Sequence, residues 1–132
     1  MARLRHRFRD AEDGQALVEF ALVLPLLALI LFAIIQFGIA FNNYLALTDA
    51  VRAGAREAAV SRAAPDPAAE AEDAVRDAAA NLNQGELSVT VTSTWVRGED
   101  VRVLATYPFT LNVLGVAVAS GQLESETTER VE

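Results

Sequence analysis

The chain has 132 residues, of which 52% are hydrophobic, and it carries a net charge of −7 without any Cys. This length allows one modest domain besides an apolar segment, and the lack of Cys excludes a disulfide framework. Its single His, His6, stands in the N-terminal part that we expect processing to remove, so neither a Ser/His/Asp triad nor a His-based metal site can be assembled. We therefore expect no enzyme activity, no cofactor and no metal. The acidic balance argues against a nucleic acid partner.

Four arginines precede the first long apolar segment. They are Arg3, Arg5, Arg7 and Arg9, and they are followed by three acidic residues, Asp10, Glu12 and Asp13. Beyond the apolar segment the charge balance is acidic. Because Arg-rich flanks remain on the cytoplasmic side of a membrane, we expect the N-terminus in the cytoplasm and the C-terminal part outside the cytoplasmic (inner) membrane.

The apolar segment, residues 20–41, contains no charged residue and one strongly polar residue, Gln36. At a rise of about 1.5 Å per residue, about 22 residues make about 33 Å of helix, enough to cross the hydrocarbon core of a lipid bilayer. Pro25 removes a backbone donor inside this helix and leaves the carbonyl of Ala21 without its partner. We expect a kink there, either as an ordinary transmembrane proline or as a functional flexible point.

Gly14 stands just before the apolar segment, and Glu19 follows five residues later. This arrangement is typical of type IV prepilins, and it places the cut between Gly14 and Gln15, which leaves the whole helix on the mature protein. An ordinary secretory signal has an apolar region of about 7–15 residues and a small-x-small cleavage site. The apolar segment here is longer, and the only tempting site of that kind, at residues 53–55, lies well beyond it. We therefore favour the prepilin interpretation.

Glu19 is unusual because an ionised side chain inside a membrane costs about 2.5 kcal/mol or more and commonly marks function. In a bundle of such helices its carboxylate needs a cation, and cleavage creates one, the amino group of Gln15 on a neighbouring subunit. We therefore expect Glu19 to set the register between subunits, with Phe20 and Pro25 beside it as further assembly residues. The alternative is a carboxylate in the headgroup region that compensates no particular charge.

The helix is expected to continue to residue 63, because no Pro or turn cluster occurs between Asn43 and Pro65. Two stripes with a spacing of four residues run along it. One contains Leu47, Val51, Ala55 and Ala59, and the other contains Ala46, Ala50, Gly54 and Ala58. Small residues at this spacing allow close approach of another backbone. The stripes either carry the chain's own globular part or pack between subunits, and both can hold on different faces.

Residues 64–67 end this helix and begin a second one, with Asp66 as its N-cap and Pro67 at its first position. Gly85 is expected to stop the second helix. Its apolar face is expected to comprise Ala71, Val75, Ala78, Ala79 and Leu82. Its acidic residues, which we expect to form a solvated face rather than a cation site, are Glu70, Glu72, Asp73 and Asp77.

From Leu87 onward the hydrophobic period changes to two. Alternation over residues 87–95 and 101–107, with a turn at 97–100, predicts a β-hairpin whose second strand ends at Pro108. Residues 109–120 are an ambiguous apolar connector, and residues 123–131 can return as a third strand. Two strands are marginal in water, so we expect a third strand and packing of the sheet on the helix stripe. Trp95 and Tyr107 are expected to be core aromatics.

The sequence therefore predicts an α+β fold of the type IV pilin-like kind, with a long N-terminal helix, a second short helix and an antiparallel sheet of about three strands. Residues 1–14 are expected to form a leader. Residues 15–63 are expected to form the transmembrane and extended N-terminal helix, and residues 64–132 a small extracytoplasmic α+β domain.

Three groups of residues together form a recognisable pattern: Gly14 with Glu19-Phe20-Ala21 and Leu24-Pro25, Phe37-Gly38, and the block Ala50-Val51-Arg52-Ala53-Gly54-Ala55-Arg56. In these residues the chain resembles the TadE-like pseudopilin family of tight-adherence (Flp) pilus systems. The similarity is dense from about Phe8 to Ala59 and thin in the C-terminal strands. Members of the family are cleaved after the glycine, and the new N-terminus can be methylated. Gln15 differs from the residues often found after the cleavage site, and this difference bears on methylation more than on cleavage, because the glycine is the more important specificity element.

This resemblance implies cleavage after Gly14 by a prepilin peptidase and a role in assembling a pilus or secretion filament. The implied partners are that peptidase, other pilin or pseudopilin subunits, the inner-membrane assembly platform and the lipid bilayer. The chain would then be a minor pilin-like subunit that acts through helix packing. The competing hypothesis is a single-span membrane protein whose outer domain binds a ligand or an envelope component and never enters a filament.

Overall fold

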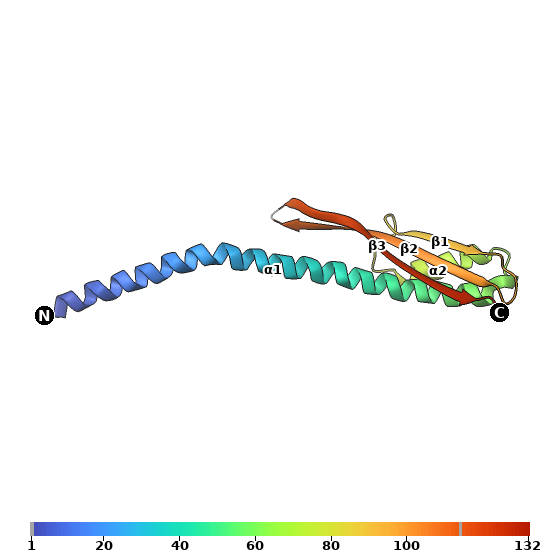
Figure 1. Ribbon diagram of the computed structural model, residues 1–132, viewed down its shortest axis with the longest axis horizontal. Coiled ribbons are helices and arrows are strands. Elements are labelled where there is room, and N and C mark those ends of the chain that lie inside the picture. Colours follow the sequence, from blue (N-terminus) through green and yellow to red (C-terminus); the bar gives the residue numbers. More distant parts are fainter. Residues whose placement is uncertain (1, 114) are drawn as a thin grey trace. The chain divides into compact units, whose positions relative to one another are not determined.

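A computed structural model describes the backbone of residues 2–113 and 115–132 and the side chains of residues 14–113 and 115–132. The elements in chain order are α1 (Ala2–Val60), the short 3₁₀ helix η1 (Ser61–Ala63), α2 (Pro67–Ala78), β1 (Ser88–Ser93), β2 (Asp100–Val113) and β3 (Val116–Arg130) (Figure 1). A long helix, a second short helix and a three-strand antiparallel sheet confirm the predicted α+β fold. The chain divides into two compact units, Met1–Gln36 and Phe37–Glu132.

Helix α1 runs without interruption through the apolar segment and into the second unit. Its continuation past the apolar segment was predicted, and η1 completes the last turn before Pro65. Pro25 lies inside the helix, and the blue part of the ribbon that contains this part of the sequence bends (Figure 1), as expected for a missing backbone hydrogen bond. The side chains of His6 and of the four arginines that precede the apolar segment lie outside the described residues.

Helix α2 begins as predicted but ends earlier than predicted. The Asp66 carboxylate accepts a hydrogen bond from the Ala69 amide at 3.1 Å, and Pro67 occupies the first turn, where a missing amide donor costs nothing. The expected stop at Gly85 is wrong, because the helix ends at Ala78. The Gln84 side chain returns to this end of the helix, since its Nε2 donates to the carbonyl of Arg76 inside α2 at 3.4 Å and to that of the C-cap residue Ala79 at 2.8 Å.

The faces of α2 are close to those predicted. Ala71 and Val75 are buried in the helix, and Ala79 and Leu82 are buried in the turns that follow it. Ala78 is exposed instead, because it is the last helical residue and the chain turns away from the helical period directly after it. The acidic residues of the other face are mainly exposed, and Glu72 pairs with Arg76 at 2.7 Å.

The sheet has the order β1-β2-β3 with both neighbouring pairs antiparallel. The predicted hairpin forms, with Ser88 opposite Thr106 and Ser93 opposite Val101. Gly98 takes a positive φ of 84° in its turn, a conformation that glycine adopts without steric cost. The third strand also forms, and its pairing with β2 extends from Asp100↔Arg130 to Val113↔Val116.

The prediction that Pro108 ends the second strand is wrong. Strand β2 continues through Pro108, which lies opposite Gln122, and residues 109–120 are the far end of a long β2–β3 hairpin rather than a connector. Pairing with β1 stops at Thr106, so β2 has a free edge at Pro108. A proline is tolerated on such an edge because no ladder hydrogen bond is required of its nitrogen.

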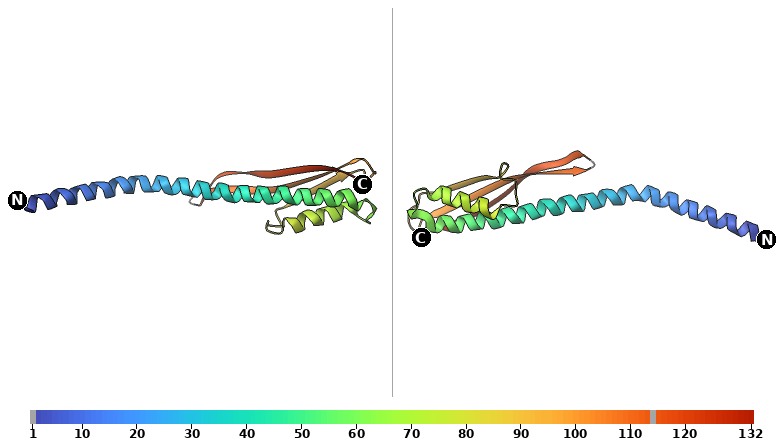
Figure 2. Two further views of the ribbon diagram at one scale, coloured as in Figure 1. Left: turned by 90° about the horizontal axis from the view of Figure 1, so that it is seen from below. Right: turned by 180° about the vertical axis from the view of Figure 1, so that it is seen from behind.

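The core lies in the second unit, between α1, α2 and one face of the sheet. Helix α1 contributes Leu47, Ala50, Val51, Ala55 and Ala58. Strand β2 contributes Val101, Val103, Ala105 and Tyr107, whose alternation with exposed residues was predicted. The Tyr107 hydroxyl accepts a hydrogen bond from the Asn83 amide at 3.3 Å, and Trp95 is partly buried against the cluster. Figure 2 shows the sheet and α2 beside α1 from two further directions.

Candidate functional site

Three residues predicted to matter for processing and assembly, Gly14, Gln15 and Glu19, lie on consecutive turns at the start of the described side chains of α1. All three are exposed. A Cβ added at Gly14 would meet nothing within 4 Å, so the chain's own packing does not require a glycine at this position. Because the surrounding backbone is helical, a peptidase that binds an extended segment must first unwind this turn.

Glu19 has a partner within its own helix. The Gln15 side-chain amide donates a hydrogen bond to the Glu19 carboxylate, with 2.9 Å between Nε2 and Oε1. This contact joins two positions four residues apart, a spacing at which side chains on a helix meet. The sequence prediction named only the amino group that cleavage would create at Gln15 of a neighbouring subunit. The four-residue spacing of Gln15 and Glu19 was the signal for the additional contact.

The described part of α1 before the core is covered by exposed apolar side chains on every side. Phe20 is 57% exposed, and no residue between Gly14 and Ile35 is buried. Phe37 and Phe41 stack on each other with ring centroids 6.2 Å apart and are likewise exposed. By length and composition, α1 is the one helix among the described residues that can cross a membrane, and its most apolar window is entirely unburied. Monomeric soluble proteins rarely expose so large a continuous apolar surface.

The small residues of the second stripe lie against the chain's own domain. Ala50, Gly54 and Ala58 are buried and Ala46 is partly buried. A Cβ at Gly54 would collide with Val75 and would lie 2.9 Å from the Ala71 carbonyl oxygen, so this glycine permits the close approach of α2. At these positions the stripe packs against the chain's own globular part, which was the first of the two predicted alternatives.

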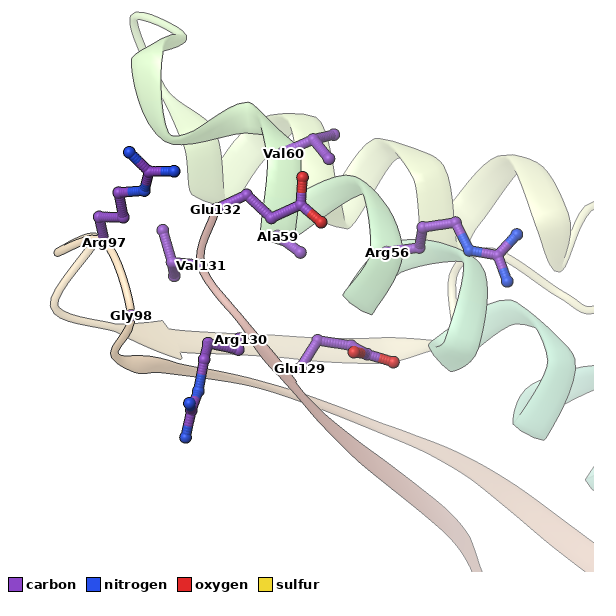
Figure 3. A pocket seen from close by; sticks show the side chains of 9 residues that line it. All are labelled: Arg56, Ala59, Val60, Arg97, Gly98, Glu129, Arg130, Val131 and Glu132. Carbon is purple, nitrogen blue, oxygen red and sulfur yellow. The ribbon is translucent and has the colours of Figure 1, made fainter.

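A shallow hollow of about 650 Å³ lies near the last turn of α1 and the end of β3. It is lined by Arg56, Ala59, Val60, Arg97, Gly98, Glu129, Arg130, Val131 and Glu132. Figure 3 shows the guanidinium groups of Arg56, Arg97 and Arg130 directed away from one another, so they do not converge on a common ligand. Among the residues with described side chains, no group of three His, Cys, Asp or Glu residues is placed to hold a metal ion.

These features define a class of protein in which one helix long and apolar enough to cross a membrane continues into a small α+β domain. Residues 14–56 match the family model described as TadE-like protein, which confirms the resemblance found in the sequence. The match begins at Gly14 and ends at Arg56, so it includes both the start of the apolar segment and the block that follows it. No curated protein and no solved structure matches the chain.

Within the matched block the structure separates two kinds of residue. Ala50, Gly54 and Ala55 are buried, whereas Arg52 and Arg56 are exposed. Arg52 approaches Asp49 at 3.6 Å on the surface, an exposed pair that contributes little to stability. The buried small residues of the block therefore contribute to the contact between α1 and the rest of the domain, and its arginines lie on the surface.

Proposed function

We propose that this chain is a minor pilin-like subunit that takes part in assembling a tight-adherence pilus or a related secretion filament. A prepilin peptidase cleaves it between Gly14 and Gln15. The mature helix is held in the cytoplasmic membrane, with the C-terminal domain outside, until it packs against other pilin-like subunits. The family match links the chain to tight-adherence pilus systems, and the finer role rests on the arguments below.

The observation that carries the proposal is the unbroken apolar surface of α1 directly after Gly14. A soluble binding protein gains nothing from such a surface, whereas a subunit that moves from lipid to a helix bundle needs an apolar surface in both environments. The domain at the other end of the helix buries its own part of α1 and leaves this segment free. Membrane anchoring alone would need the same surface, so the decisive residue is Glu19.

Glu19 tests the proposal because its two functional interpretations predict different mutants. Glu19→Ala removes a charge from the apolar segment, so membrane insertion should be retained or improved. Cleavage should persist because Gly14 is unchanged. Assembly should fail, since the carboxylate that pairs with a neighbouring amino terminus is lost while the apolar packing, which sets no register, remains. The measurement is crosslinking to other pilin subunits together with filament counts, at matched abundance of the mutant.

Two control variants sharpen this test. Glu19→Gln keeps the size of the side chain and one acceptor oxygen, but it removes the charge and replaces the other oxygen with a donor NH2 group, so it should fail as Glu19→Ala does. Gln15→Ala removes the internal hydrogen bond and keeps the carboxylate, so it should retain assembly. If Glu19→Ala crosslinks and supports filaments like the wild type, Glu19 does not set register, and the hypothesis of an anchored binding protein gains support.

A further inference from the structure

The far end of the β2–β3 hairpin extends beyond the rest of the sheet. Residues 108–113 and 116–122, called the arm below, pair with each other except at Val118, which the register skips between Leu111 and Asn112, whereas β1 pairs with β2 only as far as Thr106. Figures 1 and 2 show the arm projecting past the ends of β1 and α2. A two-stranded hairpin without a third strand or a packed face is marginal in water.

The side chains of the arm suit an apolar environment on one face and an uncharged one on the other. Phe109 and Leu111 continue the face of β2 that lies on the core, and they are only partly buried. Near the tip, Val116 is 65% exposed and Val118 is 60% exposed. The opposite face is polar but uncharged, with Thr110 as an example. Nothing else in the described part of the chain covers these valines.

At one end of the second unit, neither the sheet nor α1 has charged residues. The sequence has no charged residue between Arg102 and Glu124, although the sheet nearer to Val131 carries exposed charges on the same strands. Helix α1 has none between Phe37 and Thr48. Protein surfaces that face water are rich in charged side chains, so this shared charge-free level indicates a boundary with a different medium.

Distances along the elements place the arm at the same level as this part of α1. The Glu132 amide donates to the Ala59 carbonyl at 2.9 Å, which fixes the end of the sheet against the end of the helix. From there β2 runs back along α1 past the core. At about 3.3 Å per residue, β2 spans about 43 Å from Asp100, at this fixed end, to Val113. At about 1.5 Å per residue, α1 spans about 33 Å from Ala59 back to Phe37, so the arm reaches the level of Phe37.

We propose that the arm lies in the interfacial layer of the lipid bilayer that α1 spans, with its valines against the acyl chains of the outer leaflet. This inference rests on the proposed membrane anchoring. The arm cannot enter the hydrocarbon core, because both of its edges carry unpaired backbone groups that lipid chains cannot satisfy. The interface supplies water to these edges and apolar surface to the side chains. Tyr44 on α1, which is 40% exposed, is a residue type enriched at the same level of membranes.

The chain has no Cys, so single cysteines carrying an environment-sensitive fluorophore report on chosen sites. The full chain is labelled at Val118→Cys, Leu31→Cys or Thr128→Cys and reconstituted into phosphatidylcholine vesicles at low protein density. Nitroxide-bearing lipids then quench the label from either the headgroup end or the deep end of the acyl chain. Leu31 is an exposed residue of the apolar segment, and Thr128 is an exposed residue of β3 outside the arm.

The Val118 label should be quenched by the shallow nitroxide more than by the deep one. The Leu31 label should show the opposite order, and the Thr128 label should be quenched by neither. If the Leu31 label is quenched and the Val118 label remains accessible to aqueous iodide, the arm does not enter the interface, although the anchoring stands. Absence of lipid quenching at Leu31 would instead contradict the membrane anchoring itself.

A second copy of the chain is the other occupant that could cover the valines. In that case the Val118 label would be protected from iodide without quenching by either lipid, and the protection would increase with the protein-to-lipid ratio. This result would overturn the assignment to lipid and make the arm a contact between subunits.

Discussion

The contact between Gln15 and Glu19 gives the start of the apolar segment a polar group that is already partnered within one helix. Before cleavage, the Gln15 side chain can accompany the carboxylate into a less polar environment. After the proposed cleavage, the new amino group of Gln15 would compete for the same carboxylate, on its own chain or on a neighbour. An amino group carries a charge and the side-chain amide does not, so the charged partner should be preferred where water is scarce.

Gly54 allows α1 and α2 to approach each other closely. Gly54→Ala should destabilise the domain by about 1–3 kcal/mol, because the added Cβ collides with Val75 and crowds the Ala71 carbonyl. This loss should appear although Ala favours a helix over Gly by about 1 kcal/mol. The measurement is urea unfolding of the detergent-solubilised chain, followed through the fluorescence of Trp95, the only Trp.

Gly38→Ala is the matched control for this prediction, since a Cβ at Gly38 meets nothing within 4 Å. It should leave the unfolding midpoint unchanged or raise it slightly. Equal midpoints for Gly54→Ala and Gly38→Ala would show that α1 and α2 do not pack as closely as described.

At the scale of elements, the cap of α2 is the contact whose loss is simplest to measure. Asp66→Ala should lower the free energy of unfolding by about 1 kcal/mol, because the Ala69 amide loses its hydrogen bond. Asp73→Ala removes the same charge from an exposed position on the same helix and should change stability far less. Trp95 fluorescence in urea reports both variants, and an equal effect of the two would assign the loss to charge rather than to capping.

The starts of the elements could be predicted from the sequence better than their ends. Asp66 and Pro67 mark a helix start by local chemistry, and the alternation around Val103 marks a strand by its period. At the end of α2 the side chain of Gln84, six positions beyond the last helical residue, donates to the carbonyls of Arg76 and of the C-cap residue Ala79, a contact that no local pattern predicts. The predicted strand end at Pro108 was wrong because the effect of a proline depends on whether a neighbouring strand is present, which is a property of the sheet and not of the residue.

The candidate site was predictable to the same degree. The positions of Gly14 and Glu19 before an exposed apolar surface followed from the sequence. The element that packs on the stripe of small residues around Gly54 could not be predicted, because small residues at a four-residue spacing fit any closely approaching backbone. Only the fold shows that α2 lies against Gly54. The exposed valines of the arm could not be predicted either, because the hydrophobic pattern of residues 109–120 did not distinguish between a strand and a connector.

At the scale of the whole molecule, the account requires one orientation in the membrane. The arginines near the N-terminus should keep the N-terminus in the cytoplasm, and the acidic part beyond the apolar segment should lie outside. A phosphatase fused after Glu132 should therefore be active, and a reporter that works only in the cytoplasm should be inactive at the same site. The reverse pattern would overturn both the orientation and the pilin-like role.

The central claim is that this chain is matured as a prepilin, and N-terminal sequencing of the purified protein tests it most directly. From cells with an active prepilin peptidase, the mature chain should begin at Gln15, and without the peptidase it should retain the leader. Gly14→Ala should block or slow this step, visible as a larger band on a gel, although the substitution meets no neighbour within the chain. A wild-type protein from peptidase-positive cells that still begins before Gln15 would contradict the account.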